Sequence, residues 1–448
     1  MNNPTPNSKS EIIETRPSCR DWPEPMSDDA FYGLAGDFVR LVENETEADR
    51  HALLASFLLM ASLLFGRRVY YRVGKTKHFC NEYVALVGPT GSGGRKGLSL
   101  DYAAFIFDEK FSWINKRRFY GISSGEGLIQ KMMPNADIGE TMEMVREYLG
   151  VLTELAVLMT VSSRDGNTSS MVIRQGWDGQ TLESPSKKNP LRTENAFLSL
   201  IGHITPTELL ATLTTTDRAN GLANRFMFLA VRRSKELPEG GADVNLLDIG
   251  ERLLKARSAA MERPGTWEIC RNVEAKHLWA EEYHDLITHS EDMTGAILSR
   301  AEAHVLRISM IYALLDCSRD IKPEHVRAAL AFWDYCKRTA EFYFRGSTGD
   351  ADGDQIVQFV RAHGQITRSD VHRLFNRNRT ADWEAGKLAQ LVRAGKLVAT
   401  VCQNRQGHEQ TVWRLLDEFS EQIAPEMAPI LGTPAERQAV SENGGNHA

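Results

Sequence analysis

One glycine-rich stretch of the chain, residues 79–99, combines residue types that could bind phosphate: F-C-N-E-Y-V-A-L-V-G-P-T-G-S-G-G-R-K-G-L-S. Its apolar run from Tyr83 to Val87 is typical of a buried strand, and a helix is expected after the glycines. Glycine N–H groups can curl round a polyphosphate, the helix start adds positive potential, and Lys96 can reach the terminal phosphates. The hydroxyl of Ser99 could hold Mg²⁺. The stretch therefore predicts a nucleotide phosphate-binding loop.

The spacing differs from the standard pattern, which has four residues before the G-K pair and a Ser or Thr directly after the lysine. Lys96 lies eight positions after Gly88, and Gly97 follows it. A glycine-rich surface loop between a strand and a helix is therefore the alternative interpretation. The residues expected to contact the nucleotide are Gly88, Thr90, Gly91, Gly93, Gly94, Arg95, Lys96, Gly97, Leu98, Ser99, His203 and Thr205.

A P-loop enzyme also needs an acidic residue at the end of a neighbouring strand, to hold Mg²⁺ or to orient the attacking water. Glu154 follows the apolar run from Tyr148 to Leu152 and is the candidate for both roles. Thr153 stands where an aspartate is usual. The alternative is that Glu154 is only an acid at a helix N-terminus, where the macrodipole favours it.

A third apolar run, from Phe197 to Ile201, ends in G-H-I-T. His203 and Thr205 are placed to sense a γ-phosphate there. The alternative for Thr205 is that it caps the helix expected to begin at Pro206.

Two arginines, Arg218 and Arg225, lie seven positions apart in the turn T-T-D-R-A-N-G-L-A-N-R-F. Arg225 directly precedes a fourth apolar run, Phe226 to Val231. Either arginine could enter a neighbouring subunit's phosphate site and stabilise the transferring phosphate. The alternative is that both are ordinary surface arginines.

Apolar runs that alternate with helical stretches predict an α/β fold, a P-loop NTPase parallel sheet with flanking helices. The run from Ala52 to Phe65 has fourteen residues, too short to cross a bilayer, and predicts a buried helix. The expected segments are a disordered arm (1–26), a helical segment (27–78), the ATPase core (79–241), a helical domain (242–345), a linker (346–353), a winged helix (354–415) and a disordered acidic tail (416–448).

The winged helix-turn-helix is predicted from three helices and a hairpin. The helices are expected at 355–363, at 370–375 after a Ser369 cap, and at 381–394, and the strands at 397–402 and 410–415. Residues 351–415 hold ten Lys and Arg against six Asp and Glu, so a DNA contact is expected there. The residues assigned to it are Arg377, Arg379 and Lys396. The alternative is a protein-docking module, because Asp382 and Glu384 would repel phosphates.

Bulk properties narrow the class of protein. The net charge of −6 means that any nucleic-acid binding must use a local patch. The six cysteines are scattered without a C-x-x-C pair, which argues against a disulfide framework or a zinc site. Residues 1–25 lack an apolar core, so no signal peptide is indicated and a cytoplasmic location is expected.

These segments together resemble an uncharacterised family of RecA/AAA-like P-loop ATPases. Its members occur in phage, plasmid and mobile-element replication proteins, often beside primase–polymerase domains, and are usually described as helicases. The resemblance covers roughly residues 31–241 and rests on many blocks in one order. They are F-Y-G-L-A-G-D-F-V-R (31–40), T-E-A-D (46–49), F-G-R-R (65–68), R-K-G-L-S (95–99), D-G-N-T (165–168), R-Q-G-W-D-G (174–179), S-P-S-K-K-N-P-L-R (184–192), I-G-H-I-T-P-T-E-L (201–209), A-N-G-L-A-N-R-F (219–226) and V-R-R-S-K (231–235).

The resemblance implies an ATP- and Mg²⁺-dependent DNA motor, helicase-like, that forms a homo-oligomeric ring such as a hexamer. This sequence departs from the family's pattern at two points. The glycine loop is one residue longer, with R-K-G-L-S in place of R-K-G-T-S, and the acidic cluster at the second strand is reduced to Glu154. A second hypothesis is therefore a nucleotide-gated DNA-binding or regulatory protein with little or no hydrolysis.

Overall fold

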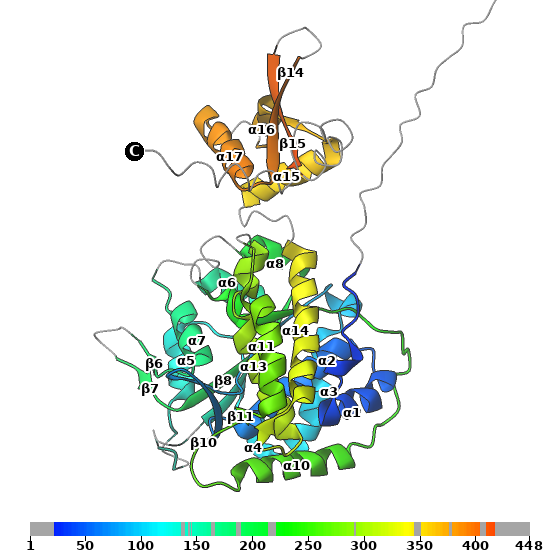
Figure 1. Cartoon of the computed structure of the whole chain (residues 1–448), viewed down its shortest axis with the longest axis vertical. Helices are drawn as coiled ribbons and strands as arrows, with labels where there is room; N and C mark the ends of the chain where they lie inside the picture. The colour runs from blue at the N-terminus through cyan, green and yellow to red at the C-terminus, as the bar shows by residue number, and fades with distance from the viewer. Residues whose placement is uncertain are drawn as a thin grey trace, which may run out of the picture. The chain divides into compact units, whose positions relative to one another are not determined.

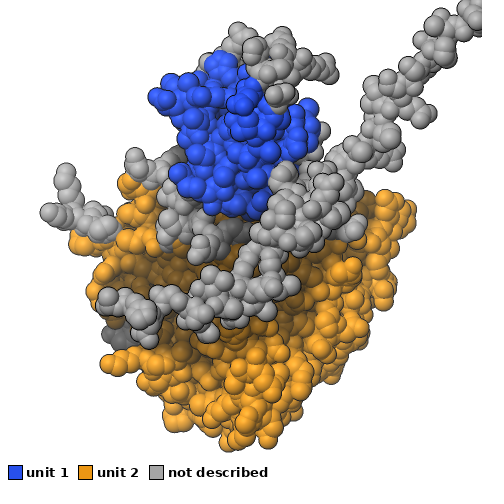
Figure 2. Space-filling view, turned by 45° about the horizontal axis from the view of Figure 1, so that its top comes forward, with its two compact units in different colours: residues 1–21, 350–448 blue, residues 22–349 orange. Residues whose placement is uncertain are grey.

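A computed structural model describes residues 22–135, 139–141, 144, 146–162, 166–184, 190–213, 221–290, 293–344, 351–375, 379–403 and 409–416. The chain divides into two compact units, coloured separately in Figure 2. One is Trp22–Gly349, and the other combines Met1–Asp21 with Asp350–Ala448. The expected segments 27–78, 79–241 and 242–345 all belong to the first unit. The arm up to residue 21, the linker residues 346–350 and the tail from residue 417 lie outside the described residues.

Five parallel strands form the central sheet of the first unit (Figure 1). Their order across the sheet is β4 (Arg118–Tyr120), β5 (Arg146–Leu152), β8 (Ala196–Ile204), β3 (Tyr83–Val87) and β9 (Phe226–Ala230). The last four correspond to the predicted apolar runs, although β9 ends at Ala230, one residue before the predicted end of its run. These runs are buried because helices cover both faces of a parallel sheet. The α/β fold with a parallel sheet is thus confirmed.

Helix α2 (Arg50–Phe65) lies on one face of this sheet, where the Ser62 and Ser199 hydroxyls are 3.1 Å apart. Every α2 residue except Arg50 is buried, which confirms the predicted buried helix. Helices α6 (Leu155–Ser162) and α7 (Ser169–Trp177) cover the other face. There Tyr83 donates a hydrogen bond to the Ile173 carbonyl at 2.8 Å.

Helix α14 (Pro323–Phe344) covers the outer edge of β9. The Ala230 amide donates to the Thr339 hydroxyl at 3.1 Å, and the Ala230 carbonyl accepts from the Tyr335 hydroxyl at 2.7 Å. Side chains of α14 therefore satisfy backbone groups that an open sheet edge would leave unpaired.

The remaining elements of the first unit surround this core. The helices are α1 (Gly33–Val42), α3 (Lys96–Lys110), α4 (Ser112–Lys116), α5 (Gly125–Met132), α8 (Pro206–Thr212), α10 (Leu247–Met261), α11 (Val273–Ile287), α12 (Met293–Leu298) and α13 (Ala301–Leu315). Short strands form a three-stranded sheet in the order β10 (Trp267–Glu268), β1 (Val69–Val73) and β2 (Thr76–His78). Two further pairs join β11 (Cys270–Arg271) with β12 (Asp320–Ile321) and β6 (Leu182–Glu183) with β7 (Arg192–Thr193).

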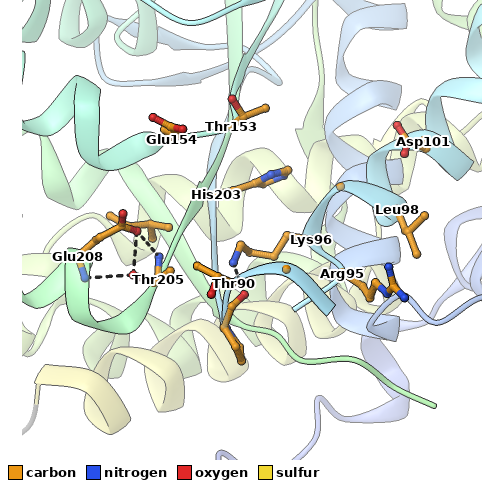
Figure 3. A pocket seen from close by; sticks show the side chains of 14 residues that line it. Thr90, Arg95, Lys96, Leu98, Asp101, Thr153, Glu154, His203, Thr205 and Glu208 are labelled. Atoms are coloured by element: carbon orange, nitrogen blue, oxygen red, sulfur yellow. Dashed lines mark hydrogen bonds between the residues drawn. The ribbon is translucent and has the colours of Figure 1, made fainter. Parts of the chain in front are cut away.

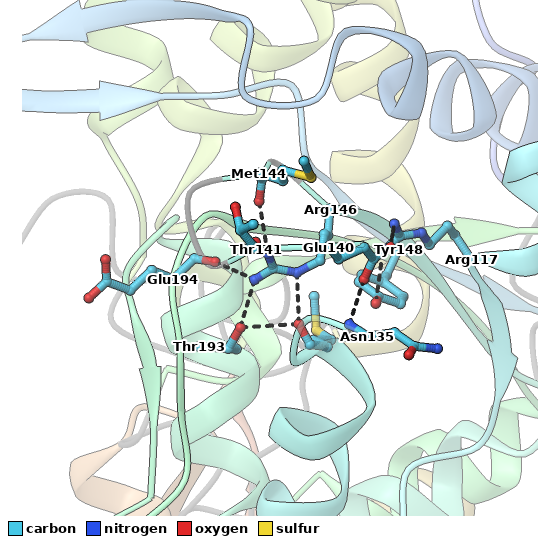
Figure 4. Close-up of polar contacts among 10 residues, drawn as sticks. Arg117, Asn135, Glu140, Thr141, Met144, Arg146, Tyr148, Thr193 and Glu194 are labelled. Carbon is cyan, nitrogen blue, oxygen red and sulfur yellow. Dashed lines mark hydrogen bonds and ion pairs between the residues drawn. The ribbon is translucent and has the colours of Figure 1, made fainter. Parts of the chain in front are cut away.

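Arg146, the first residue of β5, fixes the amino edge of the sheet (Figure 4). Its side chain is fully buried, and all five of its N–H groups donate hydrogen bonds of 2.7–3.1 Å. The acceptors are the carbonyls of Met132, Thr141, Met144 and Glu194 and the hydroxyl of Thr193. Because no donor is left unsatisfied, this arginine is buried without a carboxylate partner.

The second unit contains helices α15 (Ala351–His363), α16 (Arg368–Leu374) and α17 (Ala381–Arg393). Its antiparallel sheet has the order β13 (Ile366–Thr367), β15 (Glu409–Leu415) and β14 (Leu397–Gln403). The predicted cap of the second helix was wrong: Thr367, not Ser369, forms a capping box with Asp370. In both units, no helix of the described part of the chain is long and apolar enough to span a bilayer.

Candidate functional site

A pocket of about 640 Å³, here called the loop pocket, lies at the carboxyl edge of the central sheet (Figure 3). The ends of β3, β5 and β8 and the start of α3 contribute its walls. Its lining residues are Pro89, Thr90, Gly91, Arg95, Lys96, Gly97, Leu98, Asp101, Thr153, Glu154, His203, Ile204, Thr205 and Glu208. The structure therefore brings the predicted loop together with the predicted residues of two further strands.

Two glycines of the loop are required by close backbone approach. A Cβ on Gly88 would lie 2.1 Å from the Val231 carbonyl oxygen, and one on Gly94 would lie 2.2 Å from the Pro89 carbonyl oxygen. Gly91 has φ +57°, a left-handed conformation that glycine adopts without strain. These contacts fold the loop tightly against the ends of the strands.

The start of α3 faces the loop pocket without a side-chain cap. Its N-cap residue, Arg95, has φ +45°, which is uncommon for a residue other than glycine. The Arg95 side chain forms an ion pair with Glu47, whose Oε2 lies 2.6 Å from Nε. Uncapped N–H groups at the start of a fifteen-residue helix attract anions.

Lys96 bonds to the loop itself. Its ammonium donates to the Gly88 carbonyl at 2.7 Å and to the Pro89 carbonyl at 2.6 Å. Burial lowers the pKa of Lys96, and the Glu208 carboxylate acts in the opposite direction. Because phosphate oxygens accept stronger, charge-assisted hydrogen bonds than carbonyls, a bound polyphosphate would compete for this ammonium.

Ser99 does not line the loop pocket, although magnesium binding was predicted for it. The side chain is buried between α3 and α2, where its hydroxyl donates to the Lys96 carbonyl at 2.9 Å and accepts from Ser56 at 3.1 Å. The geometry gives Ser99 a packing role. Gly88, Gly93 and Gly94 are likewise absent from the lining, but they shape the loop.

Glu154 and Thr153 follow β5, and both side chains are exposed to the loop pocket. Glu154 directly precedes α6 and its carbonyl accepts from the Val157 amide at 3.1 Å. The carboxylate is thus both an acid at a helix N-terminus and a pocket residue, so the two interpretations are compatible.

His203 is the last but one residue of β8 and is only 9% exposed. Burial, with a smaller contribution from Lys96, lowers the pKa of His203 to about 4. Its Nε2 atom has no hydrogen-bond partner among the described residues. A neutral imidazole with an unpaired polar atom at the pocket wall can contact a ligand, since unsatisfied buried polar atoms are rare.

Thr205 caps α8, as the alternative interpretation predicted. Its hydroxyl accepts from the Glu208 amide at 3.2 Å and donates to the Glu208 carboxylate at 2.8 Å. The side-chain oxygen is therefore already engaged, although Thr205 lines the loop pocket.

Arg225 lies at the amino edge of the sheet, because the next residue, Phe226, pairs with Tyr83. The loop pocket is at the opposite edge. Arg225 is 5% exposed, with Nη2 2.8 Å from the Asp178 carboxylate and the guanidinium carbon 5.4 Å from the Trp177 ring centre. The described conformation makes Arg225 neither a surface arginine nor a group free to enter a neighbouring site. Arg218 lies outside the described residues.

The predicted DNA contacts belong to the second unit. Arg379 pairs with Asp352 at 2.9 Å, and its guanidinium carbon is 4.8 Å from the Trp383 ring centre. Lys396 follows the turn after α17, and its amide donates to the Leu391 carbonyl. Arg377 lies outside the described residues. Glu384 is buried and bonds to His372 at 2.6 Å, so its charge is not presented to solvent as the docking alternative assumed.

Two contributions to the site escaped sequence reasoning. Asp101 lines the loop pocket one turn after Gly97, and burial raises the pKa of Asp101. The i,i+4 spacing from Gly97 was a usable signal. Glu47 contacts both Arg95 at the start of α3 and Arg233 after β9, so one carboxylate connects three segments of the chain. No pattern in the sequence near Glu47 predicts these contacts.

Neither a scan against known protein-family models nor a search of curated proteins finds a match to this chain.

Proposed function

We propose that this chain binds ATP with Mg²⁺ in the loop pocket and hydrolyses it to drive a helicase-like DNA motor of a mobile-element replication system. One observation carries the proposal. A glycine-built loop with an uncapped helix start and Lys96 faces Glu154 and His203 from two neighbouring parallel strands. Ligands of open parallel sheets bind at this carboxyl edge.

Phosphate binding is assigned to the glycine-loop amides and to Lys96, which leaves the Gly88 and Pro89 carbonyls for the terminal phosphates. Glu154 is assigned to orient the attacking water, because its exposed carboxylate faces the same pocket. Mg²⁺ prefers oxygen ligands, and the Glu154 carboxylate is assigned to it. When bound, the ion would neutralise phosphate charge.

The strand order supports a RecA/AAA-like core, since β8 lies between the loop strand β3 and the acidic strand β5. The elements of the second unit follow the order helix, strand, helix, helix, strand, strand, which is the order expected of a winged helix-turn-helix. We therefore assign DNA contact to the second unit. Assembly into a homo-oligomeric ring belongs to the same proposal. Light scattering after size-exclusion chromatography, with and without ATP, tests it.

The decisive experiment measures phosphate release by the full chain with and without DNA, with Lys96→Ala as the background control. A motor requires DNA-stimulated release that the control lacks. Equal release in parent and control would refute catalysis at the loop pocket.

A nucleotide-gated regulator is the second candidate, favoured by a specific observation. Gly97 occupies the position directly after the lysine, and Ser99 is turned toward α2, so neither of these two positions supplies a hydroxyl ligand for magnesium. This protein would bind ATP tightly and change its DNA affinity without DNA-stimulated phosphate release.

A further inference from the structure

A second cavity, here called the β9 pocket, lies where the chain leaves β9 and has a volume of about 240 Å³. Three segments line it: the N-terminal stretch from Trp22 to Pro25, residues 43–51 around the start of α2, and the strip from Arg232 to Lys235. The proposed function does not yet use this cavity.

Strand pairing places the β9 pocket and the loop pocket on opposite sides of the glycine loop. The Gly88 amide donates to the Ile204 carbonyl at 3.1 Å on the β8 side, and the Val231 amide donates to the Val87 carbonyl at 2.8 Å on the β9 side. β8 continues into Thr205 of the loop pocket, and β9 continues into Arg232 of the β9 pocket. Because neighbouring strands are about 4.8 Å apart, the β9 pocket begins one strand from the loop.

Direct contacts also tie the β9 pocket to the loop. The Arg233 amide donates to the Gly93 carbonyl at 2.9 Å, and the Arg233 guanidinium contacts Glu47. The same Glu47 carboxylate holds Arg95 at the start of α3. Arg233 of the β9 pocket and Arg95 of the loop pocket are therefore connected through Glu47 and the glycine loop.

The β9 pocket is lined by the planar side chains of Trp22 and Arg232, and two of its other cations are already in ion pairs. The Arg232 guanidinium carbon lies 4.8 Å from the centre of the Trp22 ring, and Trp22 packs on Phe342 of α14 at 5.7 Å. Two other cations are already paired, Arg50 with Glu43 at 3.2 Å and Arg233 with Glu47. Because the Arg232 guanidinium already covers the Trp22 ring, a flat heterocycle would stack on the other plane of the exposed Arg232, which Trp22 supports.

We infer that the β9 pocket receives the nucleobase of the nucleoside triphosphate, an inference that rests on the proposed function. Hydrolysis requires the terminal phosphate to face Glu154, which lies on the β5 and β8 side of the loop. A linear nucleotide then leaves the loop in the other direction, toward β9. Arg232, supported by Trp22, stacks on the base. The Asn44 side chain, whose oxygen accepts from Lys235 at 3.5 Å, lies on the pocket wall and offers its NH2 group to the edge of the base.

The test compares ATP with inorganic tripolyphosphate, which has the phosphates but no base, by calorimetric titration of the full chain. Trp22→Ala removes the support of the guanidinium and Arg232→Ala removes the guanidinium itself. Each should weaken ATP binding about tenfold, the scale of one lost stacking contact on the base, and leave tripolyphosphate binding unchanged. Trp22→Phe keeps an aromatic ring and should bind ATP close to the parental affinity. The matched control is Arg263→Ala, which removes an arginine the same 4.8 Å from the ring of Trp267, elsewhere in the first unit.

The possible results separate the two proposals. Equal losses of affinity for ATP and tripolyphosphate would show that Trp22 and Arg232 act through the shape of the loop. Parental ATP affinity in both alanine variants would place the base elsewhere. Either result overturns the inference but leaves the proposed function standing. Equal affinity of the parent for ATP and tripolyphosphate would do the same. A parent that binds neither ligand would overturn the proposed function together with the inference.

Discussion

Arg95 and Glu47 form an ion pair of 2.6 Å that directs the first of two adjacent loop cations away from the second. In Figure 3 the side chains of Arg95 and Lys96 point in opposite directions. Lys96 lies beside the Gly88 and Pro89 carbonyls on the phosphate side of the loop. The neighbouring cations therefore have different tasks, one structural and one for the ligand.

The first prediction concerns these two residues. Lys96→Ala should abolish ATP binding, because the loop loses the ammonium that reaches the terminal phosphates. Arg95→Ala should keep most of the affinity, because its guanidinium is engaged by Glu47. A titration with fluorescent nucleotide measures both, and the reverse order of effects would mean that the lysine assignment is wrong.

Glu154→Gln should bind ATP as the parent does but lose hydrolysis, because the amide cannot accept the proton of the attacking water. The matched control is Glu208→Gln in the same pocket, which preserves the capping box because glutamine also serves at that position. Single-turnover phosphate release measures the step. Parental release in Glu154→Gln would leave this residue only its role at the start of α6.

Arg225→Ala should lower the melting temperature, since it removes a buried guanidinium paired with Asp178 and leaves that carboxylate without its cation. If this pairing persists in the assembly, mixing Lys96→Ala with Arg225→Ala subunits should give no more phosphate release than the sum of the two variants measured separately. Recovery of phosphate release in the mixture would show that Arg225 leaves Asp178 and completes a neighbour's site.

Stability should depend on pH through Glu147. Burial raises the pKa of Glu147 to about 7, and the unfolded value is about 4.5. Below pH 4.5 the carboxyl is protonated in both states and its burial costs no charge. As the pH rises through 7, the free energy of unfolding falls, because the folded protein must then bury a carboxylate. Glu147→Gln should therefore be more stable than the parent at pH 8, by on the order of 3 kcal/mol, but not at pH 4. Urea unfolding at both values checks this, with exposed Glu194→Gln as a control that changes little.

Deleting residues 351–448 should leave ATP binding intact, because the first unit has its own hydrophobic core, and lower DNA affinity at least several-fold. Replacing Arg377, Arg379 and Lys396 together should reproduce most of that loss. The salt slope of binding should fall by about 2–3 in log–log terms, as phosphate contacts are removed. Unchanged DNA affinity in the truncated chain would place the DNA contact in the first unit.

The sequence alone determined the features that depend on local patterns. Tyr83–Val87 was predicted to the residue, because a strand buried on both faces needs an unbroken apolar run. The Thr205 cap was also readable, since a capping box involves residues only three positions apart. The order of strand, glycines and helix placed the loop, and the ends of two further apolar runs placed Glu154 and His203 at the same edge.

Only the tertiary structure decided where side chains point. Ser99 turns toward Ser56 because α2 packs on α3, and Arg225 is buried because Trp177 and Asp178 fold beside it. Glu47 meets Arg233 across 186 positions of the chain. A side chain's direction depends on partners brought close by packing, and a local pattern carries no information about partners so distant in sequence.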